Sequence, residues 1–382
     1  MAAPRDPVAG NLRLYFHTHH GFEHERQIAA TIIYKRNTPD GTVERIVVKY
    51  GKTAMDGDTI DTEEDILRSL WGAEHIIKLL SVVSNRQHSG RKWQEPFARE
   101  LDNPNPILPW KLPISELNFP VAARSKFFIM EYLPRGTASE LVERCEAMNI
   151  DEISEPLLWY FFLCLTRACV AMAYPPSARG REPPRVLREM IPRHRPRPIL
   201  LGHWDLHLGN IMFGEYDDDP EAQPVCHQVT PILKVIDFGM SQYESTEEDS
   251  IFFNVRQTGE AIYELAIMDA SLPDDDEDRG TFLIDDDLGW TPFLTFASEE
   301  FCRDPKYSQK FRHTVARCLA VDWHDRPNLQ YLLNTCMEQA DAIGNPYKLA
   351  DEVNELFDFV PTNDDDGSEY EPSDESVGSD SF

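Results

Sequence analysis

The sequence predicts an α+β chain with a small β-rich N-terminal part, which holds one main helix, and a larger, mostly helical C-terminal part. Two observations support this fold class. Residues 13–49 contain the strand-like segments RLYF, AATIIY and ERIVVKY, and the last two flank NTPDGTV, whose Pro-Asp-Gly indicates a tight turn. Beyond residue 135, apolar residues recur at helical spacing.

The main helix of the N-terminal part is predicted over the whole of TEEDILRSLWGAEHIIKLL, where Ile66, Leu67 and Leu70 share one face. FFIMEYL, residues 127–133, is predicted to be a buried strand that ends at a Pro-Arg-Gly break. Between these segments, residues 84–125 are rich in proline, asparagine and charge. We therefore expect a long insertion there.

The C-terminal part begins with two predicted helices, SELVERCEA and SEPLLWYFFLCLTRACVAMAY. The second opens with Ser154 and an early proline, as helix starts often do. Further helices are expected at about 252–269 and 305–342. Insertions are expected at about 175–198, where arginines are frequent, and at about 214–230, where the acidic run 217–219 more plausibly lies on a solvated loop than at a magnesium site.

These patterns divide the chain into an N-terminal part at 1–133, a C-terminal part at 134–360 and a tail at 361–382. The tail is acidic and poor in apolar residues, so we expect it to be disordered. Its Ser373 and Ser376 stand beside acids and are candidate phosphorylation sites. The arginine-rich insertion is interpreted as a solvated linker in preference to a docking segment for an acidic partner.

Composition excludes several classes of partner and compartment. The 382 residues carry a formal net charge of -29, which opposes binding to nucleic acid or to an anionic membrane surface. The seven cysteines are scattered without a CxxC pair, which indicates buried thiols in a reducing compartment. No secretory signal and no uninterrupted apolar span are evident. We expect an intracellular protein, cytoplasmic or nuclear.

Two short sequence motifs contain the candidate catalytic and metal-binding residues: HWDLHLGN at 203–210 and IDFG at 236–239. Phosphoryl transfer needs a carboxylate near the attacking hydroxyl and oxygen ligands that hold magnesium against the phosphates. Asp205 and Asn210 are spaced so that one loop can aim them at an acceptor and a metal. Asp237 follows an apolar strand and supplies a charged metal ligand.

Together, in this order, the two strings resemble the catalytic loop and the magnesium-binding segment of the protein-kinase-like superfamily. The resemblance extends over about residues 10–340. It implies a bilobal kinase fold, ATP and Mg²⁺ as cofactors, Asp205 as catalytic base, and Asn210 and Asp237 as magnesium ligands. The implied reaction transfers the γ-phosphate of ATP to a hydroxyl, with a protein Ser/Thr slightly favoured over a small molecule.

The same resemblance implies a lysine that binds the phosphates of ATP and a glutamate that pairs with this lysine. RIVVKY is similar to the strand that carries the phosphate-binding lysine, which would be Lys49. Its glutamate partner should come from the following helix. Glu63 is favoured over Glu64, because Glu63 shares its helix face with residues 67 and 70.

FFIMEYL resembles the hinge between the two lobes of the superfamily. Met130 would be the gatekeeper beside the adenine, and the backbone of Glu131 and Leu133 would hydrogen-bond the base. Later, CLAVDWHDRPNLQYLL resembles a late helical pair with its Arg326-Pro327 dipeptide, and Asn254 stands where the superfamily usually has aspartate.

Four departures weaken the resemblance. HTHHGFEHERQ, where a glycine-rich loop is expected, offers only Gly21 and has four histidines (17, 19, 20, 24), for which a polar turn is favoured over a metal site. Trp204 replaces an arginine that pairs with a phosphorylated segment, which predicts a kinase not switched on that way. His207 replaces a lysine, as in aminoglycoside and choline kinases. The segment after Gly239 lacks Ala-Pro-Glu, so Arg326 lacks its expected glutamate partner.

Three functions therefore remain open. An active kinase, with His207 as a phosphate donor group, is favoured by the complete set of lysine, glutamate, aspartate, asparagine and aspartate. A pseudokinase that works as a binding module is favoured by the missing glycines. A small-molecule phosphotransferase is favoured by His207 and opposed by the Arg326-Pro327 ending.

Overall fold

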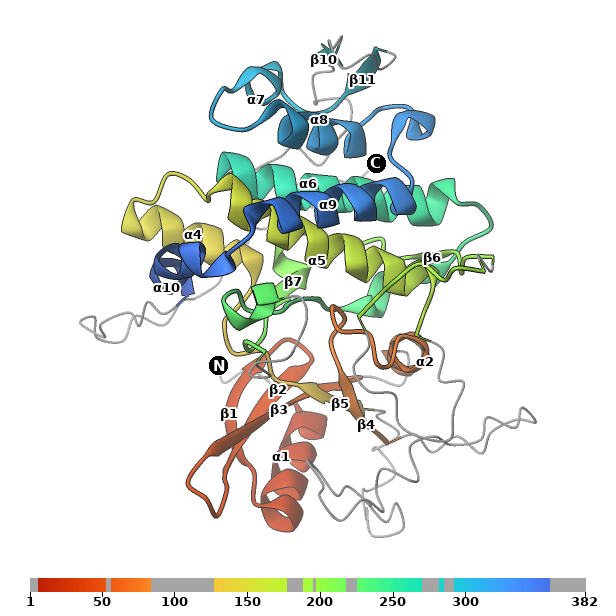
Figure 1. Ribbon diagram of the computed structural model, residues 1–382. Coiled ribbons are helices and arrows are strands. Elements are labelled where there is room, and N and C mark those ends of the chain that lie inside the picture. The colour runs from red at the N-terminus through yellow and green to blue at the C-terminus, as the bar shows by residue number, and fades with distance from the viewer. Residues whose placement is uncertain are drawn as a thin grey trace, which may run out of the picture.

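The computed structural model describes residues 6–52, 56–83, 127–176, 188–194, 197–217, 225–269, 282–284 and 292–357. A five-stranded antiparallel sheet lies near the N-terminus and helices dominate the rest (Figure 1), which confirms the α+β class. The predicted insertion at 84–125 and the tail at 361–382 lie outside the described residues, as do parts of the other two insertions.

The N-terminal sheet has the strand order β1-β2-β3-β5-β4. Its members are β1 (Glu23–Ile28), β2 (Thr31–Asn37), β3 (Val43–Tyr50), β4 (Leu79–Val83) and β5 (Phe127–Glu131). The predicted Pro-Asp-Gly turn joins β2 to β3, with Gly41 at φ +87. FFIMEYL contributes β5, as predicted, and β5 is inserted between β3 and β4.

A helix, α1 (Pro7–His20), occupies the segment for which the first strand was predicted, so the strand interpretation of RLYF was wrong. Asp6 caps its first turn by accepting hydrogen bonds from the backbone amides of residues 8 and 9, and Gly21 ends it at φ +67. Ala9, Leu12 and Phe16 are buried at helical spacing. These residues are three and four positions apart, so a helix buries all of them on one face. This burial outweighs the local β propensity of RLYF.

Alternate residues of the sheet face two different cores. Ile46, Val48 and Tyr50 of β3 pack with α1, in a core that also holds Phe127 and Ile129 of β5. The intervening residues of β3 and β5 point to the opposite face, because successive side chains of a strand alternate. Lys49 therefore faces away from α1.

The main predicted helix of this part is α2 (Asp56–Ser69), which places Ile66, Leu67 and Leu70 in the large core of the protein. The prediction extended this helix too far. The chain leaves helix after residue 69, and the HIIKLL segment forms a loop that leads into β4. The backbone of His75 and Ile77 in this loop hydrogen-bonds the backbone of Val235, which fastens the sheet part to the helical part.

Helices of the C-terminal part surround α5 (Glu155–Ala173), which is buried along nearly its whole length. The others are α4 (Ala138–Met148), α6 (Phe253–Ile267), α7 (Glu299–Arg303), α8 (Gln309–Cys318), α9 (Leu329–Ile343) and α10 (Ala350–Phe357). Helix α5 is long and apolar enough to cross a membrane, but it is buried against α6 and α9 (Figure 1) and so acts as a core helix.

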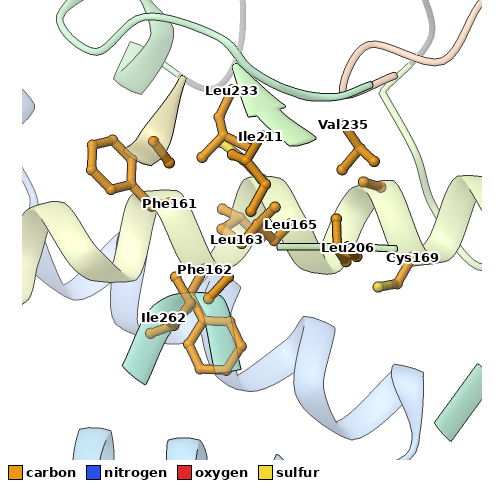
Figure 2. Close-up of a cluster of buried hydrophobic side chains, with 14 of the residues drawn as sticks. Phe161, Phe162, Leu163, Leu165, Cys169, Leu206, Ile211, Leu233, Val235 and Ile262 are labelled. Atoms are coloured by element: carbon orange, nitrogen blue, oxygen red, sulfur yellow. The ribbon is translucent and has the colours of Figure 1, made fainter. Parts of the chain in front are cut away.

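Short elements lie between α5 and the sheet. They are β6 (Leu201–Gly202), η2 (Leu208–Asn210), β7 (Ile211–Phe213), η3 (Val225–Gln228), β8 (Leu233–Val235), η4 (Phe238–Met240), β9 (Gln242–Tyr243) and η5 (Glu248–Phe252). The hairpin of β7 and β8 rests on α5, with Ile211, Leu233 and Val235 directed at the helix (Figure 2). A second small pair, β10 (Phe282–Ile284) and β11 (Phe293–Thr295), lies far from this hairpin.

Asn254 of α6 fixes the backbone that precedes HWDLHLGN. Its Oδ1 accepts a hydrogen bond of 2.9 Å from the amide of His203, and its Nδ2 donates one of 2.8 Å to the carbonyl of Leu201. The side chain is buried, so water cannot replace either bond.

We expect Asn254→Ala to lower the free energy of unfolding by about 3 kcal/mol, because it leaves two buried backbone groups unsatisfied. Urea denaturation measures this change. The control Asn334→Ala removes an exposed asparagine of α9 and should change stability by less than about 0.5 kcal/mol. Equal effects of the two variants would contradict this role for Asn254.

Candidate functional site

The central feature of the candidate site is an ion triad, defined as Lys49, Glu63 and Asp237. Nζ of Lys49 lies 2.8 Å from Oε2 of Glu63 and 2.7 Å from Oδ1 of Asp237. Lys49 and Asp237 are 188 residues apart in the sequence. The triad thus brings β3, α2 and the IDFG segment to one point.

Local structure explains why Glu63, and not Glu64, pairs with Lys49. The lysine side chain leaves the sheet on the face opposite α1, and α2 turns Glu63 toward it. Glu64 points elsewhere and forms an ion pair of 2.6 Å with Arg68, one helical turn later. Glu64 is also buried, so it does not lie on a solvated first turn of the helix.

The charges of the triad stabilise one another against burial. Burial by itself would lower the pKa of Lys49, but the negative charges of Glu63 and Asp237 outweigh it and raise that pKa. The pKa of Glu63 is raised, because burial outweighs its attraction to Lys49. Burial opposes ionisation of Asp237 as well, yet Lys49 and the Gly239 amide hold its pKa below the ordinary value. A charged lysine and a charged Asp237 result.

The loop 203–210 places Asp205, His207 and Asn210 in mutual contact. Nδ2 of Asn210 donates hydrogen bonds of 2.8 Å to the backbone carbonyl of Asp205 and 2.9 Å to its Oδ2. The side chain of Asp205 is 43% exposed, so its carboxylate remains accessible. This geometry leaves the amide oxygen of Asn210 as the atom that can bind a cation.

His207 is the more exposed member of this loop. Its Nδ1 accepts a hydrogen bond of 3.1 Å from the amide of Gly209, which in a neutral ring places the proton on Nε2. A side chain at residue 209 would collide with the ring, since a Cβ there would lie 2.8 Å from Cε1 of His207. Nε2 lies 3.2 Å from Nδ2 of Asn210 and 3.7 Å from Oδ1 of Asp205, so it is beside that carboxylate without a hydrogen bond to it.

His203 connects the loop 203–210 to the IDFG segment. Its Nε2 donates a hydrogen bond of 3.0 Å to the carbonyl of Ile236, and its Nδ1 accepts one of 3.3 Å from the amide of Asp205. The amide of Ile236 in turn donates to the carbonyl of Asn210 at 2.9 Å. These bonds place Asp205, Asn210 and the ion triad in one connected network.

Trp204 is held by the segment that follows Gly239. Its Nε1 donates a hydrogen bond of 2.8 Å to Glu244, and its ring stacks on Phe253 with centroids 4.4 Å apart. The backbone of Trp204 has φ +66, a conformation that costs a bulky residue energy and persists when surrounding contacts fix it. Only residues 240–252 separate the IDFG segment from α6.

The three predicted hinge residues lie where β5 leads into α4. Met130 is buried between Val47 of β3 and Leu79 of β4, and Leu133 is buried as well. The amide of Glu131 donates a hydrogen bond to the carbonyl of Lys78, so it is not available to a base. The carboxylate of Glu131 accepts from Lys234 at 2.6 Å, an ion pair that the sequence analysis missed.

The loop between β1 and β2 differs from the prediction. HTHHGFEHERQ was expected there, but it forms the end of α1, a short link and the start of β1. A two-residue turn, Ala29 and Ala30, joins β1 to β2. The register pairs Thr31 with Lys49, so this turn lies at the lysine end of the sheet. Ala29 adopts φ +49 without being glycine.

The histidines of HTHHGFEHERQ lie on two different elements, 17, 19 and 20 on α1 and 24 on β1. Among the described side chains, the groups close enough to share a metal ion do not include these histidines.

For magnesium, the suitable ligands in the site are Oδ2 of Asp237 and Oδ1 of Asn210, because magnesium prefers a few protein oxygens completed by phosphate and water.

Arg326, for which no glutamate partner was expected, binds backbone oxygens. Its Nε donates to the carbonyl of Ala320 at 3.0 Å, and its Nη1 donates to the carbonyl of Phe252 at 3.2 Å. It therefore fixes the point at which the segment after Gly239 enters α6.

In comparisons with known proteins, the chain matches no protein-family model and no curated protein sequence.

The buried ring of His203 makes the stability of the site depend on pH. Burial lowers its pKa to about 4, from an ordinary value of 6.5. Between these values the unfolded state binds a proton that the folded state does not, so stability falls as the pH falls.

We expect wild-type protein to lose roughly 3 kcal/mol more unfolding free energy than His203→Gln between pH 7 and pH 4. Urea denaturation at a series of pH values measures the difference. His324→Gln, which changes an exposed histidine, serves as the control and should follow the wild type. Parallel curves for wild type and His203→Gln would exclude a buried neutral His203.

Proposed function

We propose that this protein is an ATP-dependent kinase of the protein-kinase-like superfamily that transfers the γ-phosphate to a hydroxyl group. The observation that carries the proposal is the contact of Lys49 with both Glu63 and Asp237, which His203 connects through backbone hydrogen bonds to the loop of Asp205. A strand lysine, a helix glutamate and an aspartate from a distant loop gain little for stability as a buried ion network alone. Phosphate binding gives all three a chemical reason to meet.

In this proposal Lys49 binds phosphate oxygens, and Glu63 holds the lysine in place. Asp237 and Asn210 would bind magnesium, which neutralises the phosphates and orients the γ-phosphoryl group. Asp205 would accept the hydrogen of the attacking hydroxyl, and the Nε2 hydrogen of His207 would stabilise a phosphate oxygen. Most of the rate acceleration would come from positioning and electrostatics. Adenine would lie beside Met130, against the carbonyl of Glu131 and the amide of Leu133.

The hydroxyl belongs to a protein Ser/Thr in our first assignment and to a small molecule in the second. His207 favours the small molecule. The Arg326-Pro327 dipeptide favours the protein, because it resembles the ending of protein kinases, although Arg326 binds backbone carbonyls here and not a glutamate.

A binding module without transferase activity is a second candidate, supported by the turn between β1 and β2. In kinases glycine amides of this loop cover the phosphates, and here the turn has two alanines. Such a protein would bind nucleotide weakly and act through its other surfaces.

We expect Mg²⁺-ATP to raise the melting temperature of the wild type, and Asp237→Ala to remove most of this shift, because Asp237 supplies the charged metal ligand. Differential scanning fluorimetry with and without Mg²⁺ measures the shift. Asp151→Ala, an exposed aspartate before α5, is the matched control. If neither ATP nor Mg²⁺ changes the melting temperature of the wild type, the result contradicts the kinase proposal.

Transfer is then followed with ATP labelled at the γ-phosphate, using protein and small-molecule hydroxyl acceptors. Asp205→Ala should retain the ATP-dependent shift but lose at least about 100-fold in turnover, within the range for a positioned acid or base. If the wild type binds Mg²⁺-ATP but transfers the labelled phosphate to acceptors no faster than Asp205→Ala does, the result supports the binding module.

The contacts of Trp204 predict that activity does not depend on phosphorylation of the segment after Gly239. Treatment with a phosphatase should change the rate less than about twofold. Glu244→Ala should lower the rate roughly 10- to 100-fold, because the segment loses its tie to Trp204 and the catalytic loop shifts. Glu247→Ala, an exposed acid of the same segment, is the control. A large loss after phosphatase treatment would contradict this prediction.

A further inference from the structure

A second polar cluster lies on the α5 side of the β7 and β8 hairpin, away from the proposed chemistry. It consists of His75 from the loop between α2 and β4, Cys164 from α5 and His227 from η3. All three are buried, and one donor atom from each lies within 4.8 Å of the others. The proposed phosphoryl transfer uses none of them.

We propose that this cluster binds one zinc ion through Nε2 of His75, Nε2 of His227 and Sγ of Cys164. Two imidazoles and one thiolate form a ligand set that suits zinc. One tetrahedral position is left for a water molecule. On binding, the thiol proton of Cys164 is released to solvent, and the sulfur coordinates as thiolate.

The separations between ligand atoms suit a tetrahedral ion. With zinc bonds of the usual length, two imidazole nitrogens are about 3.3 Å apart, and a nitrogen and a sulfur are about 3.6 Å apart. Here Nε2 of His75 lies 3.2 Å from Nε2 of His227, and the latter lies 3.9 Å from Sγ of Cys164. The third pair, Nε2 of His75 and Sγ of Cys164, lies within 4.8 Å, so the Cys164 side chain moves toward His75 on binding.

Glu189 orients His75 for this role. Its Oε2 accepts a hydrogen bond of 2.7 Å from Nδ1 of His75, and its Oε1 accepts one of 2.8 Å from the His75 amide. The proton of His75 is thereby fixed on Nδ1, and its Nε2 presents a lone pair to His227. A carboxylate on the outer nitrogen of a coordinating histidine is a common support for metal ligands.

The alternative without metal is a hydrogen bond between Nε2 of His75 and Nε2 of His227, for which one of the two rings must carry a proton on Nε2. If His227 donates this bond, its Nδ1 becomes a bare acceptor, and that atom is buried without a hydrogen bond of normal geometry among the described residues. When each ring instead carries its proton on Nδ1, two lone pairs face each other, and a cation between them relieves the repulsion.

The surrounding charges nearly balance. Glu189 and Glu74 are negative and lie on the Nδ1 side of His75. Arg167 and Arg188 are positive and act on His227. The thiolate of Cys164 adds a negative charge when it binds the ion. Together these three negative groups can outweigh the repulsion between the ion and the two arginines.

Such an ion would add a coordinate cross-link to the hydrogen bonds that already join these segments. Glu189 and His227 come from the two segments predicted as insertions, and Cys164 comes from the central helix. The backbone of His75 also hydrogen-bonds Val235, two residues before Asp237. Zinc would therefore hold the strand that leads to Asp237 while leaving the phosphate-binding atoms untouched.

The test uses the full chain with any affinity tag removed. We expect purified protein to contain one zinc per chain by mass spectrometry of the metal. After chelation and addition of Co²⁺ alone, it should show a thiolate-to-cobalt charge-transfer band. Cys164→Ser should lose that band, whereas Cys169→Ser, a buried thiol elsewhere on α5, should keep both the band and the metal.

The wild-type spectrum decides the proposal even if a variant fails to fold. Absence of retained zinc together with absence of a thiolate-to-cobalt band in the wild type would overturn it, as would an unchanged band in folded Cys164→Ser. Chelation should lower the melting temperature of the wild type and of Cys169→Ser. Asp237→Ala should retain the zinc, so a failure of the kinase proposal is distinguishable from a failure of this one.

Discussion

The buried ammonium group of Lys49 is the constraint on which the arrangement of the site depends. A lysine that is 17% exposed must find opposite charge, because burying an unpaired charge costs several kcal/mol. Helix α2 brings Glu63 and the IDFG segment brings Asp237 to this ammonium group. The large hydrophobic core packs sheet, helix and distant loop together, and the buried charges select the register in which the three side chains meet.

A rigid backbone frame supports this ion triad from the helical side. His203 binds the carbonyl before Asp237, Asn254 binds the amide of His203, and the β7 and β8 hairpin rests on α5. The bond between Asn254 and His203 is buried, so water cannot replace it. Trp204 and Arg326 extend the frame into the segment after Gly239.

Prediction from sequence succeeded for segments whose pattern of residues is compatible with only one type of secondary structure. The turn at Pro-Asp-Gly, the strand FFIMEYL and the helices around α5 were predicted from the spacing of apolar residues and from turn-forming residues. Tertiary contacts did not change the secondary structure of these segments. Prediction failed for RLYF, where a short apolar run suits a strand as well as a helix. The helix signals, Asp6 with Pro7 before it and Gly21 after it, lie outside the run. Misplacing α1 also misplaced the loop between β1 and β2.

The sequence by itself determined which polar residues are candidates for a site: Asp205, Asn210 and Asp237 in two short motifs, a strand lysine, and two adjacent helix glutamates. Only the tertiary structure decided which of two adjacent glutamates meets Lys49, how the alanine turn lies at the lysine end of the sheet, and that His75, Cys164, Glu189 and His227 converge. The reason is physical. Spacing fixes the direction of a side chain within one element, whereas contacts between elements are set by packing and by the pairing of buried charges over long stretches of chain.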